Sequence, residues 1–249
     1  DNEIADALKT KKFQPTNSFD VLKQADVIII AVPTPLDEYK IPDLACIKDA
    51  SGEIAKYLRP NQLIILESTT YPGTTEEVVL PILTKIQDTN SKIQINSKFQ
   101  ILNSKQIQNS KFKIVIGKNL FVAFSPERVD PGNKNFNTKN TPKVVGGVTK
   151  NCTKMATLFY SQVIDKPVPV SSARAAEMTK LLENIFRIVN ISMINELALL
   201  CNKMKIDIWE VIEAASSKPY GFMPFYPGPG IGGHCIAVDP WFIVHDYKN

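Results

Sequence analysis

Short, strongly apolar β-prone runs alternate with segments of helical periodicity in the first half of the chain, and this alternation constrains the fold most. The runs are ADVIIIAV at 25–32, QLIILES at 62–68 and FVAFS at 121–125, with helices predicted near 43–58 and 74–87. This order predicts a parallel sheet covered by helices. Because VIII and LIIL are apolar at every position, both are expected to be central strands that are covered on both faces.

Turn residues follow each of the three runs: VPTP at 32–35, STTYPGT at 68–74 and SPERVDPG at 125–132. The crevice of an open α/β sheet lies outside the carboxyl ends of its strands. Turn chemistry alone explains any single one of these segments. Three in succession favour a ligand site at this edge.

A stretch of some 33 residues without Gly or Pro begins near Ser172, SARAAEMTKLLENIFRIVNISMINELALLCNKM. It predicts one long helix, capped by Ser171 or Ser172, that serves as a spine between domains or as a dimer surface. A shorter helix is expected in DIWEVIEAASS at 207–217.

On the long helix, Lys180, Asn184 and Arg187 are spaced i, i+4 and i+7 and share one stripe. The stripe is either a solvated polar face or the wall of a cleft. In a cleft, its hydrogen-bond donors would suit an oxyanion or a polyol.

The glycine-rich stretch PGPGIGGHCIAVDPWF at 227–242 follows a helix and prolines rather than a strand, which argues against a dinucleotide phosphate turn. Adjacent His234 and Cys235 rarely converge on one ion, so no metal site is predicted. A thiol at Cys235 with Asp239 nearby remains as the chemical candidate. The other cysteines, Cys46, Cys152 and Cys201, are expected to be small buried hydrophobes without a role.

The composition is that of an ordinary soluble globular protein, with 44% hydrophobic residues, 22% charged residues and a formal net charge of +4. This small basic excess argues against a nucleic-acid partner. No apolar run approaches the roughly 18 residues that suggest a membrane span, and the N-terminus has no apolar signal core, so we expect a cytoplasmic protein without a membrane segment. The motif NSK recurs at Asn90, Asn96, Asn103 and Asn109, and marks a low-complexity surface insertion at about 88–113.

Several motifs agree in order and spacing with a known family: VPTP, ESTTYPGTTEEVVLPIL, AFSPERVDPGN, PKVVGG, RAAEMTKLLENIFR, NELALLC and YPGPGIGGHCIAVDPWF. Together they resemble the UDP-glucose/GDP-mannose dehydrogenase family, in its nucleotide-sugar branch acting on UDP-N-acetylhexosamines. The resemblance implies an α/β fold, with an incomplete Rossmann-like parallel sheet followed by a long central helix and a helical middle domain. It implies a partial NAD-binding domain at 1–170 and a central helical domain with the cysteine loop at 171–249.

The resemblance also implies a reaction, the oxidation of the C6 alcohol of a UDP-sugar to a carboxylate in two hydride transfers to NAD+. Cys235 matches the nucleophile that forms a thiohemiacetal and then a thioester. Lys180 and Asn184 match the pair that stabilises oxyanion character, and Asp239 matches the water-activating aspartate. Other matching positions imply contacts to NAD at Thr34 and Thr69, and contacts to substrate at Arg128, Val129, Lys180, Asn184, Arg187 and Gly232.

Some residues differ from the family pattern, and these differences bear on the expected substrate. Asp130 and Pro131 follow SPE where the UDP-glucose branch has an aromatic stretch and a second catalytic glutamate. Pro219 and Gly221 stand where the N-acetylmannosamine branch has a histidine and an arginine, so the chain looks more like enzymes that oxidise UDP-N-acetylglucosamine or its epimers. The GxGxxG turn of the family and its C-terminal UDP-binding domain are absent from the sequence, which makes the chain resemble a fragment.

Three functions are therefore weighed. The first is a UDP-N-acetylhexosamine 6-dehydrogenase that works as a homodimer through the long helix. The second is a catalytically inactive fragment or an oligomerisation module of that family. The third is a generic β-hydroxyacid dehydrogenase, which needs a lysine on the long helix and no cysteine.

Overall fold

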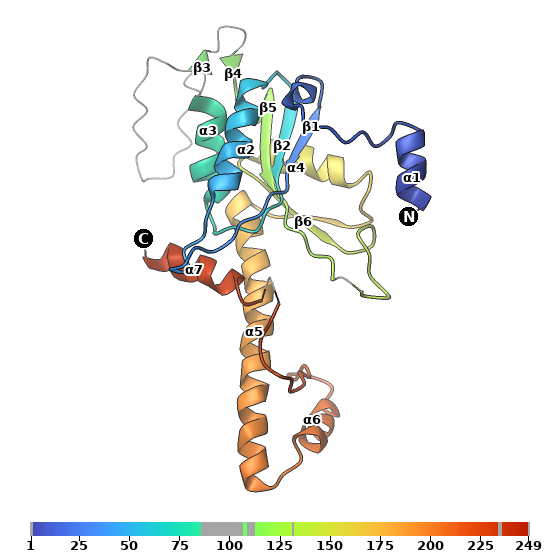
Figure 1. The fold of residues 1–249 in the computed structure, drawn as a ribbon, viewed down its shortest axis with the longest axis vertical. Coiled ribbons are helices and arrows are strands. Elements are labelled where there is room, and N and C mark those ends of the chain that lie inside the picture. Colours follow the sequence, from blue (N-terminus) through green and yellow to red (C-terminus); the bar gives the residue numbers. More distant parts are fainter. Residues whose placement is uncertain (1, 86–106, 109–112, 131, 234–235, 249) are drawn as a thin grey trace.

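The computed structural model describes residues 2–85, 107–108, 113–130, 132–233 and 236–248 (Figure 1). The strands are β1 (Val27–Ile30), β2 (Gln62–Leu66), β3 (Ile107–Gln108), β4 (Lys113–Ile114), β5 (Leu120–Phe124), β6 (Lys143–Gly147) and β7 (Pro167–Pro169). The helices are α1 (Asn2–Lys9), α2 (Ala45–Lys56), α3 (Leu80–Lys85), α4 (Lys150–Tyr160), α5 (Ala173–Met204), α6 (Ile208–Ser216) and α7 (Asp239–Lys248). A 3-10 turn, η1 (Phe19–Lys23), and a π-helical turn, η2 (Thr75–Val79), complete the order.

The main sheet has five strands in the order β1-β2-β5-β6-β7. β1, β2 and β5 are parallel, as the alternating sequence pattern predicts. β6 runs antiparallel to β5, with Ala123 opposite Gly147 and Phe124 opposite Gly146, and β7 is parallel to β6. The expected α/β architecture is therefore confirmed as a mostly parallel sheet followed by a long helix.

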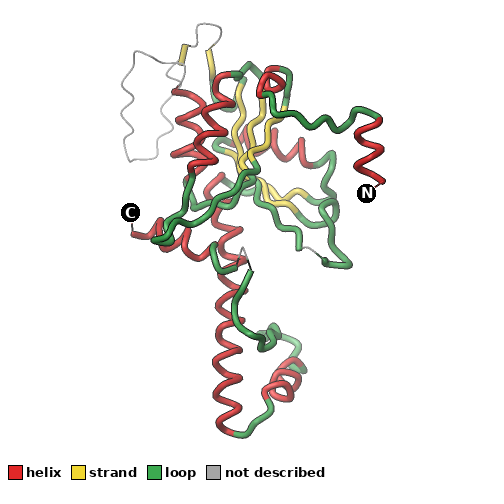
Figure 2. Tube along the Cα trace, in the orientation of Figure 1, coloured by secondary structure: helices red, strands yellow, loops and turns green. Residues whose placement is uncertain are grey.

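Figure 2 shows helices on both sides of the strands. The apolar side chains of β2 alternate, with a period of two, between two buried layers. Ile64 and Leu66 pack into the layer that includes residues of α2 and α3. Leu63 and Ile65 face the opposite layer, where Ala156 of α4 lies. Every residue of β2 is buried, which confirms the prediction that LIIL is a central strand.

The same prediction is wrong for VIII, because β1 lies at the edge of the described five-stranded sheet. Ile28 and Ile30 are buried in the α2 and α3 layer, whereas Ile29 points to the other face and is 41% exposed. The apolar run VIII therefore did not indicate a strand that is buried on both faces.

The predicted helix at 74–87 is divided into η2 and α3. In the π-helical turn, the N–H of Leu80 donates to the carbonyl of Thr75. Pro81 is the next residue and has no N–H to donate, so it would interrupt a regular α-helical hydrogen-bond pattern. The change from π-helical to α-helical hydrogen bonds occurs at this point.

The long helix α5 has 32 residues, and it extends about 48 Å at 1.5 Å per residue. Ser172 caps its start by accepting a hydrogen bond from the N–H of Ala175, so the expected cap is confirmed. Only its first part packs against the sheet; the rest runs away from the sheet with α6 beside it (Figure 1).

A glycine lets this packing occur. A Cβ built on Gly146 would lie 2.1 Å from the carbonyl oxygen of Ser172 and 3.0 Å from the Cβ of Ala176. Any side chain at this position would push the start of α5 off strand β6.

Along α5, from near its start to its end, one face carries large apolar side chains that are 40–59% exposed in the chain. We call this set the α5 stripe: Met178, Leu182, Phe186, Val189, Met193, Leu197, Leu200 and Met204. By length and composition alone, α5 is apolar enough to cross a membrane, with a mean hydropathy of 1.3 over an 18-residue window. This differs from the expectation that no apolar run approaches membrane-spanning length, because a few polar residues interrupt the apolar positions of α5.

The predicted insertion at 88–113 lies almost wholly outside the described residues, apart from β3 and the first residue of β4, which pair antiparallel. Among the cysteines, Cys152 is buried, as expected. Cys46 is exposed and Cys201 is half-buried, so the expectation of a buried thiol is wrong for Cys46.

Candidate functional site

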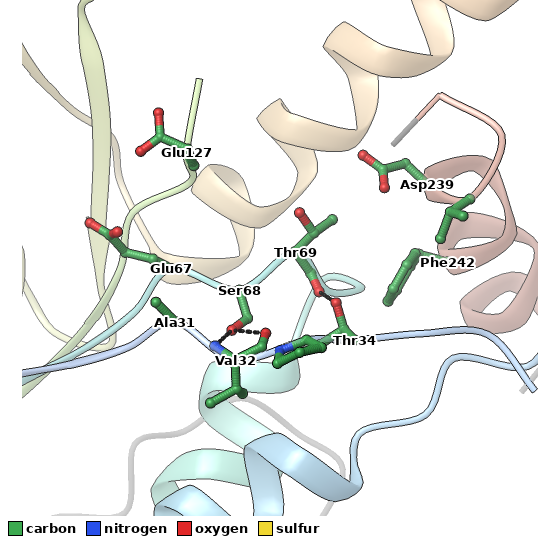
Figure 3. A pocket seen from close by; sticks show the side chains of 11 residues that line it. Ala31, Val32, Thr34, Glu67, Ser68, Thr69, Glu127, Asp239 and Phe242 are labelled. Carbon is green, nitrogen blue, oxygen red and sulfur yellow. Dashed lines mark hydrogen bonds between the residues drawn. The ribbon is translucent and has the colours of Figure 1, made fainter. Parts of the chain in front are cut away.

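A cavity of about 390 Å³ opens at the carboxyl ends of β1 and β2, the edge at which the turn residues predicted a ligand site (Figure 3). Its lining comes from four separate segments: Ala31, Val32, Pro33 and Thr34 after β1, Glu67, Ser68 and Thr69 after β2, Glu127 after β5, and Val238, Asp239 and Phe242 around the start of α7. The sheet therefore supplies the floor and one wall, and α7 supplies the opposite wall.

Hydrogen bonds join the two turns that follow β1 and β2. The hydroxyl of Ser68 accepts from the N–H of Val32 at 2.8 Å and donates to the carbonyl of Val32, also at 2.8 Å. The hydroxyl of Thr34 donates to the carbonyl of Thr69 at 2.8 Å. These bonds fix the backbone at the cavity floor and bring the predicted pair Thr34 and Thr69 side by side.

The start of α7 is held against the turns by aromatic contacts. Phe242 is fully buried. The rings of Tyr71 and His245 lie 5.4 Å apart, and the ammonium of Lys40 lies 4.4 Å from the centre of the Trp241 ring. Because Lys40 follows β1 and Tyr71 follows β2, α7 is attached to both sides of the cavity opening.

Asn184 and Asp239 meet at the far wall of the cavity. The side-chain amide of Asn184, on α5, donates a hydrogen bond to the carboxylate of Asp239, the first residue of α7. Asn184 is 9% exposed and Asp239 is 3% exposed. The structure thus brings together two of the predicted catalytic residues, from positions 55 residues apart in the chain.

Lys180 lies one turn before Asn184 and is half-buried. Its ammonium donates to the carbonyl oxygen of Glu127 at 2.8 Å, so it contacts the cavity wall through the backbone. Arg187, the third member of the predicted stripe, is exposed and does not line the cavity. Lys180 and Asn184 do not line the cavity themselves, but each hydrogen-bonds a residue that does, Glu127 and Asp239 respectively.

Two predicted substrate contacts follow Glu127 along the chain. The guanidinium of Arg128 pairs with the carboxylate of Glu183 on α5, with its nitrogens 2.5 and 3.2 Å from the two oxygens. The N–H of Val129 donates to the carboxylate of Glu127 at 2.7 Å. In this structure both residues order the segment beside the cavity, and neither lines it.

An unpredicted polar group forms the wall between β2, β5 and β6. The ammonium of Lys143 lies 3.0 Å from the carboxylate of Glu67 and 3.7 Å from that of Glu127. The hydroxyl of Tyr160 on α4 donates to Glu67, and burial, followed by the Glu67 charge, raises the pKa of Tyr160. Burial alone would raise the pKa of Glu127, but the N–H of Val129 and the charge of Lys143 outweigh it and lower that pKa below its ordinary value.

The glycines of the loop at 228–233 are not required by close packing against the described residues. A Cβ on Gly228, Gly230, Gly232 or Gly233 would meet no atom within 4 Å. Gly230 and Gly233 have φ values of +126° and +85°, which side-chain-bearing residues rarely adopt. Conformation therefore explains glycine at these two positions, and close packing against the part of the chain that the structure describes explains none of the four. His234 and Cys235 lie outside the described residues.

Residues that sequence reasoning missed are Glu67, Ser68, Glu127 and Phe242 in the cavity lining, and Lys143 and Tyr160 behind it. The turn segments at 68–74 and 125–132 carried the signal for Ser68 and Glu127. Nothing local in the sequence marks Lys143 or Tyr160, because both reach the site through strand and helix pairing.

Two family models match the chain. The NAD binding domain of the UDP-glucose/GDP-mannose dehydrogenase family matches residues 1–164, and the central domain of the same family matches residues 174–249. The chain is 38% identical over 246 residues to Protein CapL from Staphylococcus aureus, covering 98% of this chain and 52% of that protein. It is 36% identical over 248 residues to the UDP-N-acetyl-D-glucosamine 6-dehydrogenase of Pseudomonas aeruginosa, covering 99% of this chain and 52% of that protein.

Among solved structures, the UDP-D-ManNAc dehydrogenase of Pyrococcus horikoshii superposes with a TM-score of 0.83 at 30% identity. The superposition covers all of this chain and 53% of that one. The chain thus spans about half the length of the curated relatives it matches.

Proposed function

The chain belongs to the UDP-glucose/GDP-mannose dehydrogenase family, and we propose that it oxidises the C6 alcohol of a UDP-N-acetylhexosamine, of the UDP-N-acetylglucosamine type, to the uronate with NAD+ as the oxidant. The cavity carries this proposal, because it places Thr34, Thr69 and Asp239 around one space at the carboxyl ends of parallel strands. That edge is where open α/β sheets bind nucleotides.

The residues of the cavity fit a nicotinamide ring. Its floor is apolar at Ala31, Val32 and Pro33, Phe242 closes one side, and the hydroxyl-bearing residues Thr34 and Thr69 stand at the carboxyl ends of β1 and β2. A flat amide-bearing ring suits apolar walls with a few polar groups. NAD+, when bound, would accept the hydride that leaves C6.

The chain's own residues would divide the remaining chemistry. Lys180 and Asn184 would stabilise negative charge on the C6 oxygen with their N–H groups. Asp239 would orient and activate water, and its bond from Asn184 supports this role because it holds the carboxylate at the cavity wall. The same bond means that Asn184 must share its amide between Asp239 and the substrate oxygen.

Cys235 would be the nucleophile, a role that rests on the sequence because the residue lies outside the described ranges. After the first oxidation removes a hydride and a proton from the alcohol, the Cys235 thiolate adds to the aldehyde and gives a thiohemiacetal. Loss of a second hydride gives a thioester, and water releases the uronate and the thiol. A thiol suits both steps, since a thioester forms by oxidation and hydrolyses readily.

The N-acetylglucosamine type of substrate is proposed from Pro219 and Gly221 and from the similarity to the Pseudomonas enzyme. Arg128, Val129, Arg187 and Gly232 would contact the nucleotide sugar. For Arg128 this requires that it leave Glu183 or bind substrate with its remaining N–H groups.

We further propose that the α5 stripe forms a homodimer interface. Its eight large apolar side chains recur at spacings of three and four residues and so share one face of the helix. The buried end of the same helix carries Glu177 and Asn184 in hydrogen bonds to other segments, which ties it to the folded sheet.

The test is an assay of the purified 249-residue chain, and of the longest reading frame that contains it, with NAD+ and either UDP-N-acetylglucosamine, UDP-N-acetylmannosamine or UDP-glucose. We expect two NADH per uronate, preference for UDP-N-acetylglucosamine, and loss of uronate formation in Cys235→Ala. Normal turnover by Cys235→Ala would overturn the mechanism. If neither protein oxidises any of the three sugars, the chain is an inactive member of the family, and the dimer proposal is then tested alone.

A further inference from the structure

Lys143, the first residue of β6, is a buried cation beside the cavity. Its side chain is 9% exposed. The ammonium lies 3.0 Å from Oε1 of Glu67 and 3.7 Å from Oε2 of Glu127, and it donates to the carbonyl of Pro126 at 3.4 Å. Glu67 and Glu127 both line the cavity, whereas Lys143 does not. The lysine therefore reaches the cavity only through these two carboxylates.

Each carboxylate has a second set of contacts that fixes its orientation. Oε1 of Glu127 accepts hydrogen bonds from the N–H groups of Arg128 and Val129, both at 2.7 Å, which leaves Oε2 toward Lys143. Oε1 of Glu67, the same oxygen that pairs with Lys143, also accepts a hydrogen bond from the Tyr160 hydroxyl. Lys143 thus pairs with two carboxylates, each of which is also held by other hydrogen bonds.

The charge balance of this wall depends on Lys143. A buried ammonium is costly to desolvate, and it persists in proteins when it is paired. Without it, two carboxylates would share a partly buried wall, and like charges held close together raise the pKa of one of them. One carboxylate would then take up a proton at a higher pH than it does beside Lys143.

Other charged and titratable groups also face Glu127. Lys180 on α5 binds its carbonyl oxygen, Glu67 on β2 shares the lysine, and Tyr160 on α4 lies behind Glu67. Of the two ammonium groups, Lys143 is the one paired with the carboxylate itself. The lowered pKa of Glu127 agrees with this arrangement.

Resting on the proposed function, we propose that Lys143 is a positioning residue for the oxidation: paired with both Glu67 and Glu127, it holds the Glu127 carboxylate in place at the cavity wall and keeps it ionised to lower pH. Each alcohol oxidation releases a proton together with the hydride. A carboxylate at the cavity wall accepts a proton only while it is ionised, so the residue that keeps it ionised affects the reaction without touching substrate.

The experiment measures the titration of Glu127 by carboxyl carbon NMR in the wild-type chain and in Lys143→Met. We expect the Glu127 midpoint to rise by about one pH unit in Lys143→Met, because the paired charge is lost. Lys143→Arg should keep the low midpoint, and Lys154→Met, on the exposed side of α4, is the matched control that should not move it. An unchanged Glu127 midpoint in a folded Lys143→Met variant overturns the proposal.

If Lys143→Met does not fold, Glu67→Gln takes its place. It removes the competing carboxylate, so Lys143 serves Glu127 alone and the Glu127 midpoint falls further; a midpoint that stays or rises overturns the proposal. The titration needs no turnover, so it gives a result even if the oxidation assay fails. In an active protein, the acid limb of NADH formation should move with the Glu127 midpoint and be restored by Lys143→Arg.

Discussion

The carboxylate of Glu177 accepts hydrogen bonds from both the main-chain N–H and the hydroxyl of Thr75, at 2.9 and 2.7 Å. A third bond comes from the N–H of Gly73 at 2.6 Å. Glu177 is fully buried on α5, one turn before Lys180, and the turn that it holds follows Thr69 of the cavity. This carboxylate therefore couples the helix that carries the proposed catalytic residues to the floor of the proposed NAD site.

Replacing Glu177 with Gln should lower the free energy of unfolding by about 2 kcal/mol, because the new NH2 group faces N–H donors and cannot accept their bonds. Urea unfolding followed by circular dichroism measures this. Glu196→Gln, an exposed change on the same helix, is the control and should stay within about 0.5 kcal/mol of wild type. Equal stabilities for the two variants would contradict the coupling role.

Gly146→Ala should be strongly destabilising, by about 3 kcal/mol, because the added Cβ would lie 2.1 Å from the Ser172 carbonyl and force β6 and α5 apart. Gly52→Ala makes the same chemical change inside α2, where no atom lies within 4 Å of the new Cβ, and should stabilise the chain by about 0.5–1 kcal/mol. Thermal and urea unfolding of the two variants gives opposite signs if the packing is as described.

The sequence was a good guide wherever local pattern decides structure. The apolar run at Leu63–Leu66, the helical stretch after Ser172 and the turns that end β1 and β2 all lie where the pattern placed them. Each depends on neighbours within a few residues, such as the Ser172 cap and its bond from Ala175.

What the sequence did not reveal depends on pairing between distant segments. Strand β6 runs antiparallel to β5, and this direction brings Lys143 beside Glu67, which lies 76 positions earlier in the chain. No local sequence pattern predicts that contact. The exposure of Ile29 likewise follows from the edge position of β1 and not from its composition. Helical spacing placed Lys180, Asn184 and Arg187 on one stripe, but it could not show that the first two reach the cavity through Glu127 and Asp239 while Arg187 is exposed.

The acid sensitivity of the fold should depend in part on Glu127. Its pKa in the folded chain lies below the ordinary value of 4.5, so its contribution to stability is present above that value and is lost as the pH falls through the folded pKa. Glu127→Gln should therefore flatten the loss of stability on acidification. Urea unfolding midpoints from neutral to acidic pH test this, and parallel curves for variant and wild type would contradict it.

Asp239→Asn should reduce uronate formation by about 100-fold or more if Asp239 activates water, since a neutral amide cannot accept the proton. The change keeps the shape of the side chain and an oxygen that can accept from Asn184, so the unfolding midpoint should move little. Asp49→Asn, on the exposed side of α2, is the matched control for the loss of one charge. A variant that stays folded and still turns over normally would remove Asp239 from the mechanism.

The α5 stripe should decide the oligomeric state. Its side chains are 40–59% exposed in the single chain, and burying a large apolar side chain contributes about 1.5–3 kcal/mol. Val189→Asp and Met193→Asp each place a charge in the middle of the stripe, so either change should convert a dimer into a monomer in analytical ultracentrifugation. Lys203→Asp, an exposed charge reversal near the end of the same helix, controls for altered helix charge.

The same variants separate dimerisation from membrane binding, which the length and apolarity of α5 also permit. If α5 forms a dimer interface, the wild-type chain has twice the monomer mass and stays in solution when added lipid vesicles are sedimented. A helix that enters a bilayer sediments with the vesicles and loses that binding in Val189→Asp. The hydrogen bonds of Glu177 to η2 and of Asn184 to α7 favour the first outcome, because insertion would have to pull the folded end of α5 toward the lipid. Monomeric wild-type chain that stays in solution would contradict both.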